Sequence, residues 1–117
     1  MLEEFLRRAA LFDMYGALLT EKQQRCLSMY LLEDYSLSEI GEALGISRQA
    51  AHDTLRRSEQ AMEAYESRLG LIARQEAERK TLAEIYEDLR VLRTNDVAEK
   101  ERLLGKLAPL TGLEDIK

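Results

Sequence analysis

Six polar side chains between residues 47 and 57 are of the types that bind nucleic acid. Arginine can donate two hydrogen bonds to guanine, and glutamine can pair in the same way with adenine in the major groove of DNA. The segment holds three arginines against one aspartate, so its charge is positive. Helical spacing places most of these residues on one polar side, which is the arrangement of a recognition helix. The candidate residues are Ser47, Arg48, Gln49, His52, Arg56 and Arg57.

A helix-turn-helix over residues 36–57 would position these side chains. Ser36 is a good N-cap, and Glu39 three residues later completes a capping box, so a helix is predicted to begin directly after Ser36. Gly45 can adopt the left-handed conformation that ends a helix. Ser47 can then cap the second helix. The sequence therefore predicts two short helices joined by a tight turn.

The apolar residues of this segment are spaced for packing one helix against the other. Leu37, Ile40 and Leu44 recur at helical intervals. Gly41 lies on the same face, where a small residue would let the second helix cross closely, and Ile46 is expected to point back into the core. The same pattern also suits a helical hairpin that serves as packing or as a platform for a protein partner.

Two helices are expected before the helix-turn-helix. The first runs from Leu2 to about Leu19, and Gly16 is an alternative end for it. Its expected apolar side consists of Leu2, Phe5, Leu6, Ala9, Phe12, Met14 and Tyr15. A second capping box, formed by Thr20 and Gln23, opens a helix that is expected to continue through Leu32. Its expected inward residues are Cys26, Leu27, Tyr30 and Leu31.

The second helix of the helix-turn-helix has no stop signal after Arg57 and is expected to continue to Gly70. Its apolar stripe is continued by Met62, Tyr65, Leu69 and Ile72. A further helix carries a short seam with the spacing of a heptad repeat. The residues of this seam are Leu82, Ile85, Leu89 and Leu92. Two arrangements remain open for it: packing within the chain, and pairing with a second copy.

A last helix is expected after Asn95 and Asp96, which should break the preceding helix. Asp96 and Glu99 form a third capping-box pattern, and Pro109 with Gly112 should end regular structure and leave a loose tail. The expected division of the chain is residues 1–70, with the helix-turn-helix, and residues 71–117, a C-terminal helical extension. The extension could also belong to the same compact domain.

The composition fits an all-α protein. The chain has 117 residues, of which 33% are charged, with one proline and no tryptophan, and no segment alternates as a strand would. No segment is apolar enough to span a membrane, and the N-terminus is not a secretory signal, so we expect a cytoplasmic protein without membrane insertion. Cys26 is the only cysteine, which excludes an internal disulfide and favours a buried structural thiol.

The overall charge limits how nucleic acid could be bound. The net charge is −5 and the isoelectric point about 5.0, which argues against binding driven by a general positive field. Any contact must therefore be local. A basic face this small would bind weakly unless the protein is dimeric, is carried by a partner, or recognises the shape of its site.

The sequence contains no recognisable catalytic site. His52 is the only histidine, no serine or cysteine lies in a nucleophile motif, and no glycine-rich phosphate loop is present. The acidic pairs Glu3–Glu4, Glu33–Asp34 and Glu87–Asp88 are typical of solvated helix faces. We therefore expect no enzyme activity, no cofactor and no metal site. His52 could contact a base edge or a phosphate. Alternatively, it is an exposed histidine of the helix that makes only local polar contacts.

The segment from Leu19 to Leu71 resembles the YlxM-like family of small bacterial proteins, and its most distinctive part is SLSEIGEALGISRQAAHDTLRR. Members share a helix-turn-helix similar to the fourth region of sigma factors. The resemblance implies a DNA-binding regulator, linked to the signal recognition particle because family genes commonly neighbour those for its GTPases. The implied partners are duplex DNA or the RNA of the particle, its GTPase, and a second copy of the chain.

The resemblance also implies a role for each candidate residue. Ser47 would cap the recognition helix, and Arg57 would hold phosphate. The side chains implied to face the groove are Arg48, Gln49, His52 and Arg56. Family members often have a bulkier residue in place of Ala51 and an aromatic residue in place of His52, so the packing and surface of this helix differ here. The alternative function is a protein- or RNA-binding accessory of the particle; a third is a plain helical dimerisation module.

Overall fold

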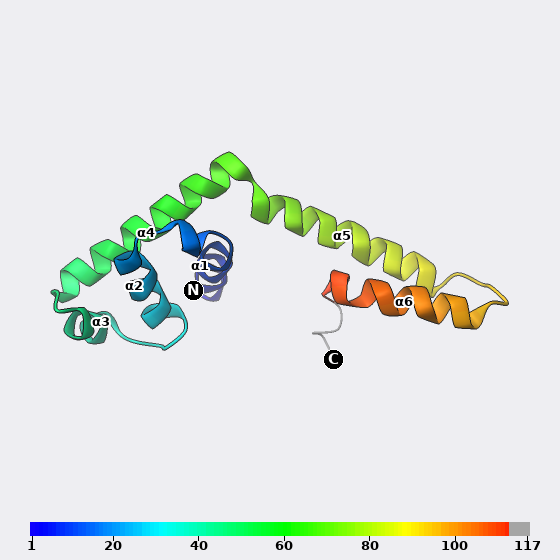
Figure 1. The fold of residues 1–117 in the computed structure, drawn as a ribbon, viewed down its shortest axis with the longest axis horizontal. Helices are drawn as coiled ribbons and strands as arrows, with labels where there is room; N and C mark the ends of the chain where they lie inside the picture. The colour runs from blue at the N-terminus through cyan, green and yellow to red at the C-terminus, as the bar shows by residue number, and fades with distance from the viewer. Residues whose placement is uncertain (113–117) are drawn as a thin grey trace. The chain divides into compact units, whose positions relative to one another are not determined.

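The computed structural model describes residues 1–112, and in that range it contains six α-helices, one short 3₁₀ helix and no strand (Figure 1). The all-α prediction is confirmed. The elements are α1 (Leu2–Tyr15), η1 (Gly16–Leu18), α2 (Glu21–Leu31), α3 (Leu37–Leu44), α4 (Arg48–Leu69), α5 (Leu71–Arg90) and α6 (Val97–Thr111). No described helix combines the length and apolar character needed to cross a membrane.

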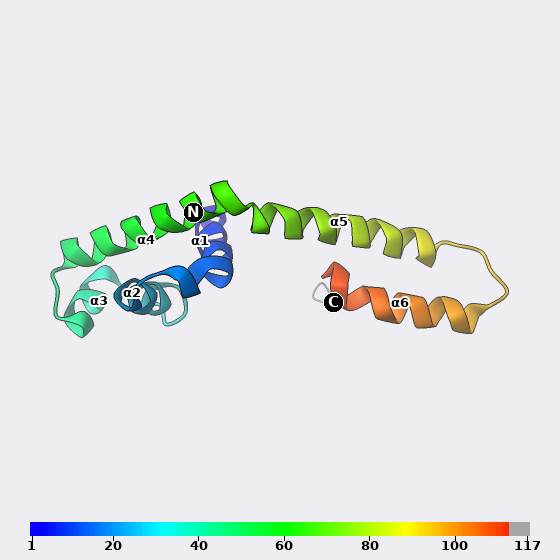
Figure 2. The same cartoon turned by 45° about the horizontal axis from the view of Figure 1, so that its top comes forward.

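The chain divides into two compact units. Unit 1 covers Met1–Ile72 and contains α1 to α4 with the first residues of α5. Unit 2 covers Ala73–Lys117 and contains the rest of α5 together with α6. In unit 1, the long helix α4 packs against α1, α2 and α3, as both views show (Figure 2).

The core of unit 1 consists of two neighbouring clusters of buried residues. The first contains Leu11, Tyr15, Leu19, Leu27, Leu31 and Met62, and the second contains Cys26, Ile40 and Ala51. Tyr30 and Leu55 pack against both clusters, so α1, α2, α3 and α4 share one continuous apolar interior. Burying apolar side chains from all four helices is the main stabilising term for such a unit.

The predicted face of α1 is wrong in part. The helix ends at Tyr15 with Gly16 as its C-cap, which is the earlier of the two predicted ends, and η1 follows it. Leu11 and Tyr15 are the buried residues, whereas Leu2, Phe5 and Leu6 are exposed. The orientation follows from the packing of Leu11 and Tyr15 into the core shared with Met62 of α4. Two ion pairs with α4 accompany this packing, in which Arg7 contacts Glu63 and Arg8 contacts Glu59, each at 2.7 Å. The pattern of α1 alone could not predict partners more than fifty residues away.

Helix α2 follows its prediction closely. Thr20 and Gln23 form the complete capping box, and the helix ends at Leu31, one residue before the predicted end. Cys26 is fully buried, as predicted, and its thiol lies 3.8 Å from the carbonyl oxygen of Ala51. Burial raises the pKa of the Cys26 thiol, so the group stays neutral and unreactive.

Helix α4 continues to Leu69, and Gly70 ends it in the left-handed conformation, as predicted. Met62 is buried, and Tyr65 and Ile72 pack against the core, as predicted, but Leu69 is exposed, so the predicted apolar stripe fails at Leu69. The junction with α5 is held by unit 1 itself. The hydroxyl group of Tyr15 donates a hydrogen bond to the carboxylate of Glu66, which also accepts the backbone N–H of Ile72 at 3.0 Å.

Unit 2 is a helical hairpin, with α6 alongside α5 in both views (Figure 2). Helix α5 ends at Arg90, earlier than the predicted break at Asn95 and Asp96. Asp96 does cap α6, accepting the backbone N–H of Glu99 at 3.0 Å. The third capping box is nevertheless wrong, because the carboxylate of Glu99 pairs with Arg102 instead of returning to Asp96.

The end of α6 also differs from the prediction. Pro109 lies inside the helix, which continues to Thr111. Proline removes one intrahelical hydrogen bond, but Pro109 is exposed, so water can satisfy the freed carbonyl group. Gly112 has a φ of 76° and ends the helix, as predicted. The predicted loose tail lies outside the described residues.

Candidate nucleic-acid interface

The start of α3 is fixed by a capping box that the sequence predicted. The backbone N–H of Glu39 donates to the Ser36 hydroxyl oxygen at 3.1 Å, and the N–H of Ser36 donates to the Glu39 carboxylate at 2.9 Å. These bonds to the charged form hold the pKa of Glu39 below its usual range. The first helix of the pair therefore begins at a defined residue.

The turn between α3 and α4 requires glycine at two positions. Gly45 has a φ of 70°, and the backbone N–H of Ile46 donates to the carbonyl oxygen of Gly41 at 2.8 Å. A Cβ atom on Gly41 would lie 2.7 Å from the carbonyl oxygen of Ile46, closer than real Cβ atoms approach. Gly41 is thus needed for close approach, but to the backbone of the turn rather than to the body of the second helix.

Helix α4 begins at the predicted residue. Ser47 is its N-cap, and the Ser47 hydroxyl oxygen accepts the backbone N–H of Ala50 at 3.0 Å. Ala51 and Ile40 are fully buried against Cys26, which packs α3 and α4 onto α2. This packing fixes the rotation of α4, so the opposite side of its first three turns is open to solvent.

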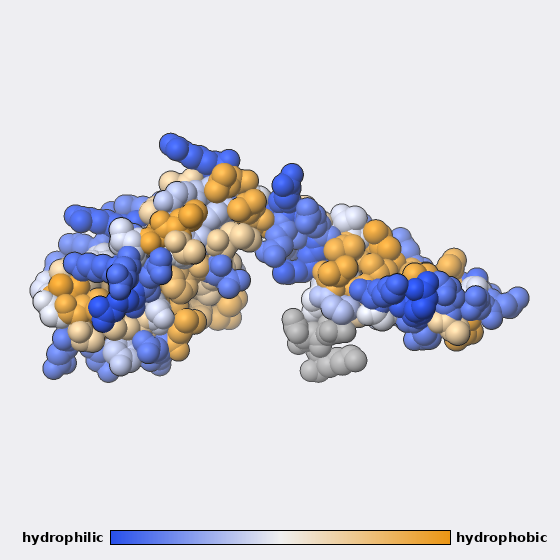
Figure 3. Space-filling model, viewed as in Figure 1, coloured by the Kyte–Doolittle hydropathy of each residue, from blue (hydrophilic) through white to orange (hydrophobic). Residues whose placement is uncertain are grey.

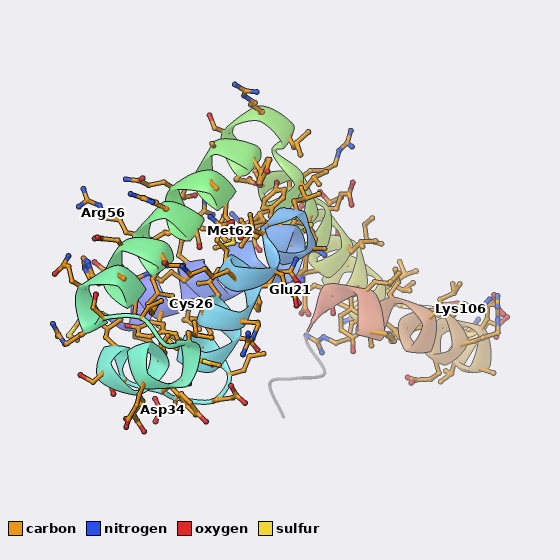
Figure 4. All side chains as sticks on the ribbon, turned by 60° about the vertical axis from the view of Figure 1, so that its left-hand side comes forward. Glu21, Cys26, Asp34, Arg56, Met62 and Lys106 are labelled. Atoms are coloured by element: carbon orange, nitrogen blue, oxygen red, sulfur yellow. The ribbon has the colours of Figure 1, made fainter. Side chains whose placement is uncertain are left out.

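The six candidate residues all lie at this open end of α4 and are exposed. Arg48 and Gln49 are the first two residues of the helix. Gln49, His52 and Arg56 succeed one another at intervals of three and four and share one face, while Arg48 and Arg57 lie on its two flanks. Figure 4 shows Arg56 pointing away from α4, whereas Met62 and Cys26 point into the interior.

Asp53 also belongs to this face, although sequence analysis did not count it among the candidates. Its carboxylate accepts a hydrogen bond from the Gln49 side-chain amide at 3.1 Å and lies 3.7 Å from Nδ1 of His52. The four-residue spacing of glutamine and aspartate on a helix was a usable signal for this pair. Asp53 therefore holds the side chain of Gln49 by a hydrogen bond and lies next to His52.

The arginines of the face differ from the two arginines of α1. Arg7 and Arg8 are held in ion pairs that join α1 to α4. Arg48, Arg56 and Arg57 make no ion pair with any described residue, and the same is true of Arg25 and Arg68. A guanidinium group without a protein partner is available to phosphate or to a base edge.

A groove lies beside the face, and sequence analysis missed it. It has a volume of about 660 Å³ and is shared by α1, α2, α3 and α4. Its lining residues include the apolar Leu27, Tyr30, Leu37 and Leu55, and the polar Arg8, His52, Arg56 and Glu59. The Arg8 guanidinium lies 5.9 Å from the centre of the Tyr30 ring, at cation–π range. Its residues come from four helices, so local patterns could not reveal it.

The described residues hold no group of three or more metal-binding side chains. The site instead combines a capped helix, a glycine turn and free guanidinium groups. These features define unit 1 as a helix-turn-helix protein, with α4 in the position of the recognition helix.

The chain belongs to the UPF0122 family. The model of this family, described as "Putative helix-turn-helix protein, YlxM / p13 like", matches residues 2–103. The resemblance found in the sequence is thereby confirmed.

Relatives in several bacteria are similar along most of their length. A UPF0122 protein of Symbiobacterium thermophilum is 49% identical over 88 residues, covering 75% of this chain and 82% of the relative. One of Thermoanaerobacter pseudethanolicus is 44% identical over 94 residues, covering 80% of each chain. One of Halalkalibacterium halodurans is 40% identical over 114 residues, covering 97% of this chain and all of the relative.

Proposed function

We propose that the protein is a DNA-binding regulator that acts by binding and not by catalysis. The observation that carries this proposal is the exposed face of α4, where Arg48, Arg56 and Arg57 make no ion pair with described residues. In this proposal, residues 1–70 form the nucleic-acid-binding domain and residues 71–117 form an extension. Membership in a helix-turn-helix family supports it.

Each side chain of the face has a role in the proposal. Arg48 or Arg56 donates two hydrogen bonds to guanine, and Gln49 pairs with adenine, each contact contributing about 1–3 kcal/mol of discrimination. Arg57 contacts phosphate, which positions the helix without specifying sequence. His52 approaches a base edge or a phosphate beside Arg56, while Ser47 keeps the helix start in place.

Two copies would act together in this proposal. The net charge of −5 opposes binding to a polyanion, and three arginines supply only a small local attraction. A homodimer presents two recognition helices to two half-sites, so the second contact forms at a high effective concentration. We therefore propose a homodimer as the active form.

Charge reversal on the face tests the proposal. The variant Arg48→Glu with Arg56→Glu should lower the affinity for a pool of duplex DNA at least about tenfold, measured by fluorescence anisotropy. Arg68→Glu with Arg93→Glu is the matched control, since both residues are exposed and the change in net charge is the same. Equal affinity of the wild type and the face variant would reject the proposal.

The groove favours a second candidate function, a protein- or RNA-binding accessory of the signal recognition particle. Its apolar floor at Leu27 and Leu55 suits a partner side chain, and its rim at His52 and Arg56 overlaps the basic face. The RNA of the particle should be titrated beside the DNA pool. Binding to the RNA alone, or copurification with the GTPase without binding to DNA, would favour this second function over the first.

A further inference from the structure

The α5–α6 hairpin leaves large apolar side chains in solvent. Among the described residues of unit 2, Leu104 and Thr111 are the buried ones. Ile85, Leu92 and Leu110 are 47%, 53% and 56% exposed. Figure 3 shows apolar atoms gathered across the middle of the hairpin. The backbones of α5 and α6 also approach each other less closely than those of α3 and α4.

These side chains lie on one face of the hairpin. In α5, Leu82 and Leu89 are half-buried on the side of α6, and Ile85 lies next to them around the helix. In α6, Leu107 is half-buried on the side of α5, and Leu110 lies next to it around the helix. Ile85 and Leu110 are each rotated in the same sense away from the residues that face the other helix. Because the two helices are antiparallel, this rotation brings Ile85 and Leu110 to the same side of the hairpin.

We propose that this face of the hairpin pairs with the same face of a second copy of the chain. The hairpin face is defined as Ile85, Leu92, Leu103 and Leu110. Two packed helices bury only one stripe of each helix, and a stable helical unit covers the remaining apolar stripe with another element. Two hairpins joined in this way form a four-helix bundle.

The charges beside the hairpin face favour a second copy as the occupant. The outer edge of α5 carries the acidic residues Glu84 and Asp88. The outer edge of α6 carries the basic residues Arg102 and Lys106 together with the acidic Glu99, so its net charge is positive. A two-fold axis along the helices lays α5 of one copy over α6 of the other, so each acidic edge meets a basic edge.

Three of these four edge side chains are available for such contacts. Within the described range, Glu84, Asp88 and Lys106 make no ion pair, whereas Arg102 pairs with Glu99 on its own helix. An acidic or a basic partner would match only one of the two edges. The hairpin face matches itself, because it carries both signs of charge with an apolar strip between them.

This inference supplies the surface for the homodimer of the proposed function. It does not depend on the arginine face of α4. The hairpin could pair two copies that bind no DNA, and Arg48→Glu with Arg56→Glu should leave the association of the copies unchanged. Failure of DNA binding and failure of pairing are therefore separate results.

Sedimentation equilibrium of the full chain over a series of protein concentrations tests the inference. The wild type should behave as a dimer. The variant Ile85→Lys with Leu110→Lys should weaken the dimer at least tenfold, and the control Val97→Lys should not, since Val97 is equally exposed on the other flank of α6. A wild type that is monomeric at every concentration would overturn the inference, as would equal dimerisation by the face variant.

A charge exchange keeps the test independent of folding defects. Asp88→Lys and Lys106→Asp, made singly, should each raise the dissociation constant of the dimer. The double variant should restore association, because an acidic and a basic side chain again lie on the two edges that meet, with their positions exchanged. Additive weakening in the double variant would contradict the proposed arrangement. Circular dichroism should show helical content like that of the wild type in the restored variant.

Discussion

Units 1 and 2 are both helical, yet they are held together by different means. In unit 1, four helices contribute fully buried side chains to a continuous core. In unit 2, the described residues bury Leu104 and Thr111 alone and leave much of the apolar surface of α5 and α6 exposed. The comparison indicates that unit 1 has a complete buried interior. The described part of the hairpin has an incomplete one.

The ion pairs show the same difference. In unit 1, Arg7 and Arg8 reach across to Glu63 and Glu59, joining helices that are far apart in sequence. The described ion pairs of unit 2, Glu87 with Arg90 among them, join residues three positions apart on one helix. Pairs of the second type support a helix but fix no tertiary arrangement. Ion pairs therefore help to fix the tertiary arrangement of unit 1, whereas the described ion pairs of unit 2 do not join α5 to α6.

The largest effect should come from the core of unit 1. Ile40→Ala should lower the free energy of unfolding by about 2–5 kcal/mol, because the side chain is fully buried and its removal leaves a cavity. Chemical denaturation at fixed protein concentration measures the change. Leu82→Ala in the hairpin should lower the free energy of unfolding by less, because the Leu82 side chain is only half-buried. A larger decrease for Leu82→Ala than for Ile40→Ala would contradict the difference between the two units.

Substitutions of one glycine in each unit should give smaller changes in stability and should differ in sign between the two units. Gly41→Ala should destabilise unit 1 by about 1–3 kcal/mol, because its Cβ would meet the carbonyl oxygen of Ile46 at 2.7 Å. Gly105→Ala in α6 meets no atom within 4 Å and should stabilise the hairpin by about 0.5–1 kcal/mol. Thermal melts of the two variants should therefore shift in opposite directions. Shifts in the same direction would contradict the account of the turn.

The smallest effect should appear in the pH dependence of stability at alkaline pH. Burial, together with the hydrogen bond to Glu66, raises the pKa of Tyr15 above its ordinary value of 10.0. The neutral phenol is thus favoured in the folded state, so its stabilisation is complete below pH 10 and is lost as the pH rises through the raised pKa. Tyr15→Phe should flatten this loss in unfolding titrations from pH 8 to 12. An unchanged alkaline slope would show that Tyr15 does not titrate on unfolding.

Local signals predicted the helix-turn-helix well. The capping boxes at Ser36 and Thr20, the left-handed Gly45 and the cap at Ser47 depend on residues within a few positions of one another. The stop at Gly70 is of the same kind. Helix caps and helix ends of this type depend on neighbouring residues, so a single sequence is sufficient to predict them.

Features that depend on distant partners could not be predicted in the same way. The predicted face of α1 was wrong in part because Leu11 and Tyr15 pack with residues of distant helices such as Met62 of α4. The groove requires residues from four helices, and the pairing of Glu99 with Arg102 displaced the expected capping box. The sequence was sufficient to predict that the candidate site residues are exposed at the start of a helix. The hydrogen bond between Gln49 and Asp53 appeared only in the structure.

Amide hydrogen exchange on the full chain, with and without duplex DNA and at two protein concentrations, tests the central claim most directly. The claim is that unit 1 binds nucleic acid through the start of α4, while the hairpin contacts a second copy. DNA should slow exchange in residues 45–57, and higher protein concentration should slow exchange in α5 and α6. Protection by DNA confined to the hairpin, with residues 45–57 unchanged, would contradict the account.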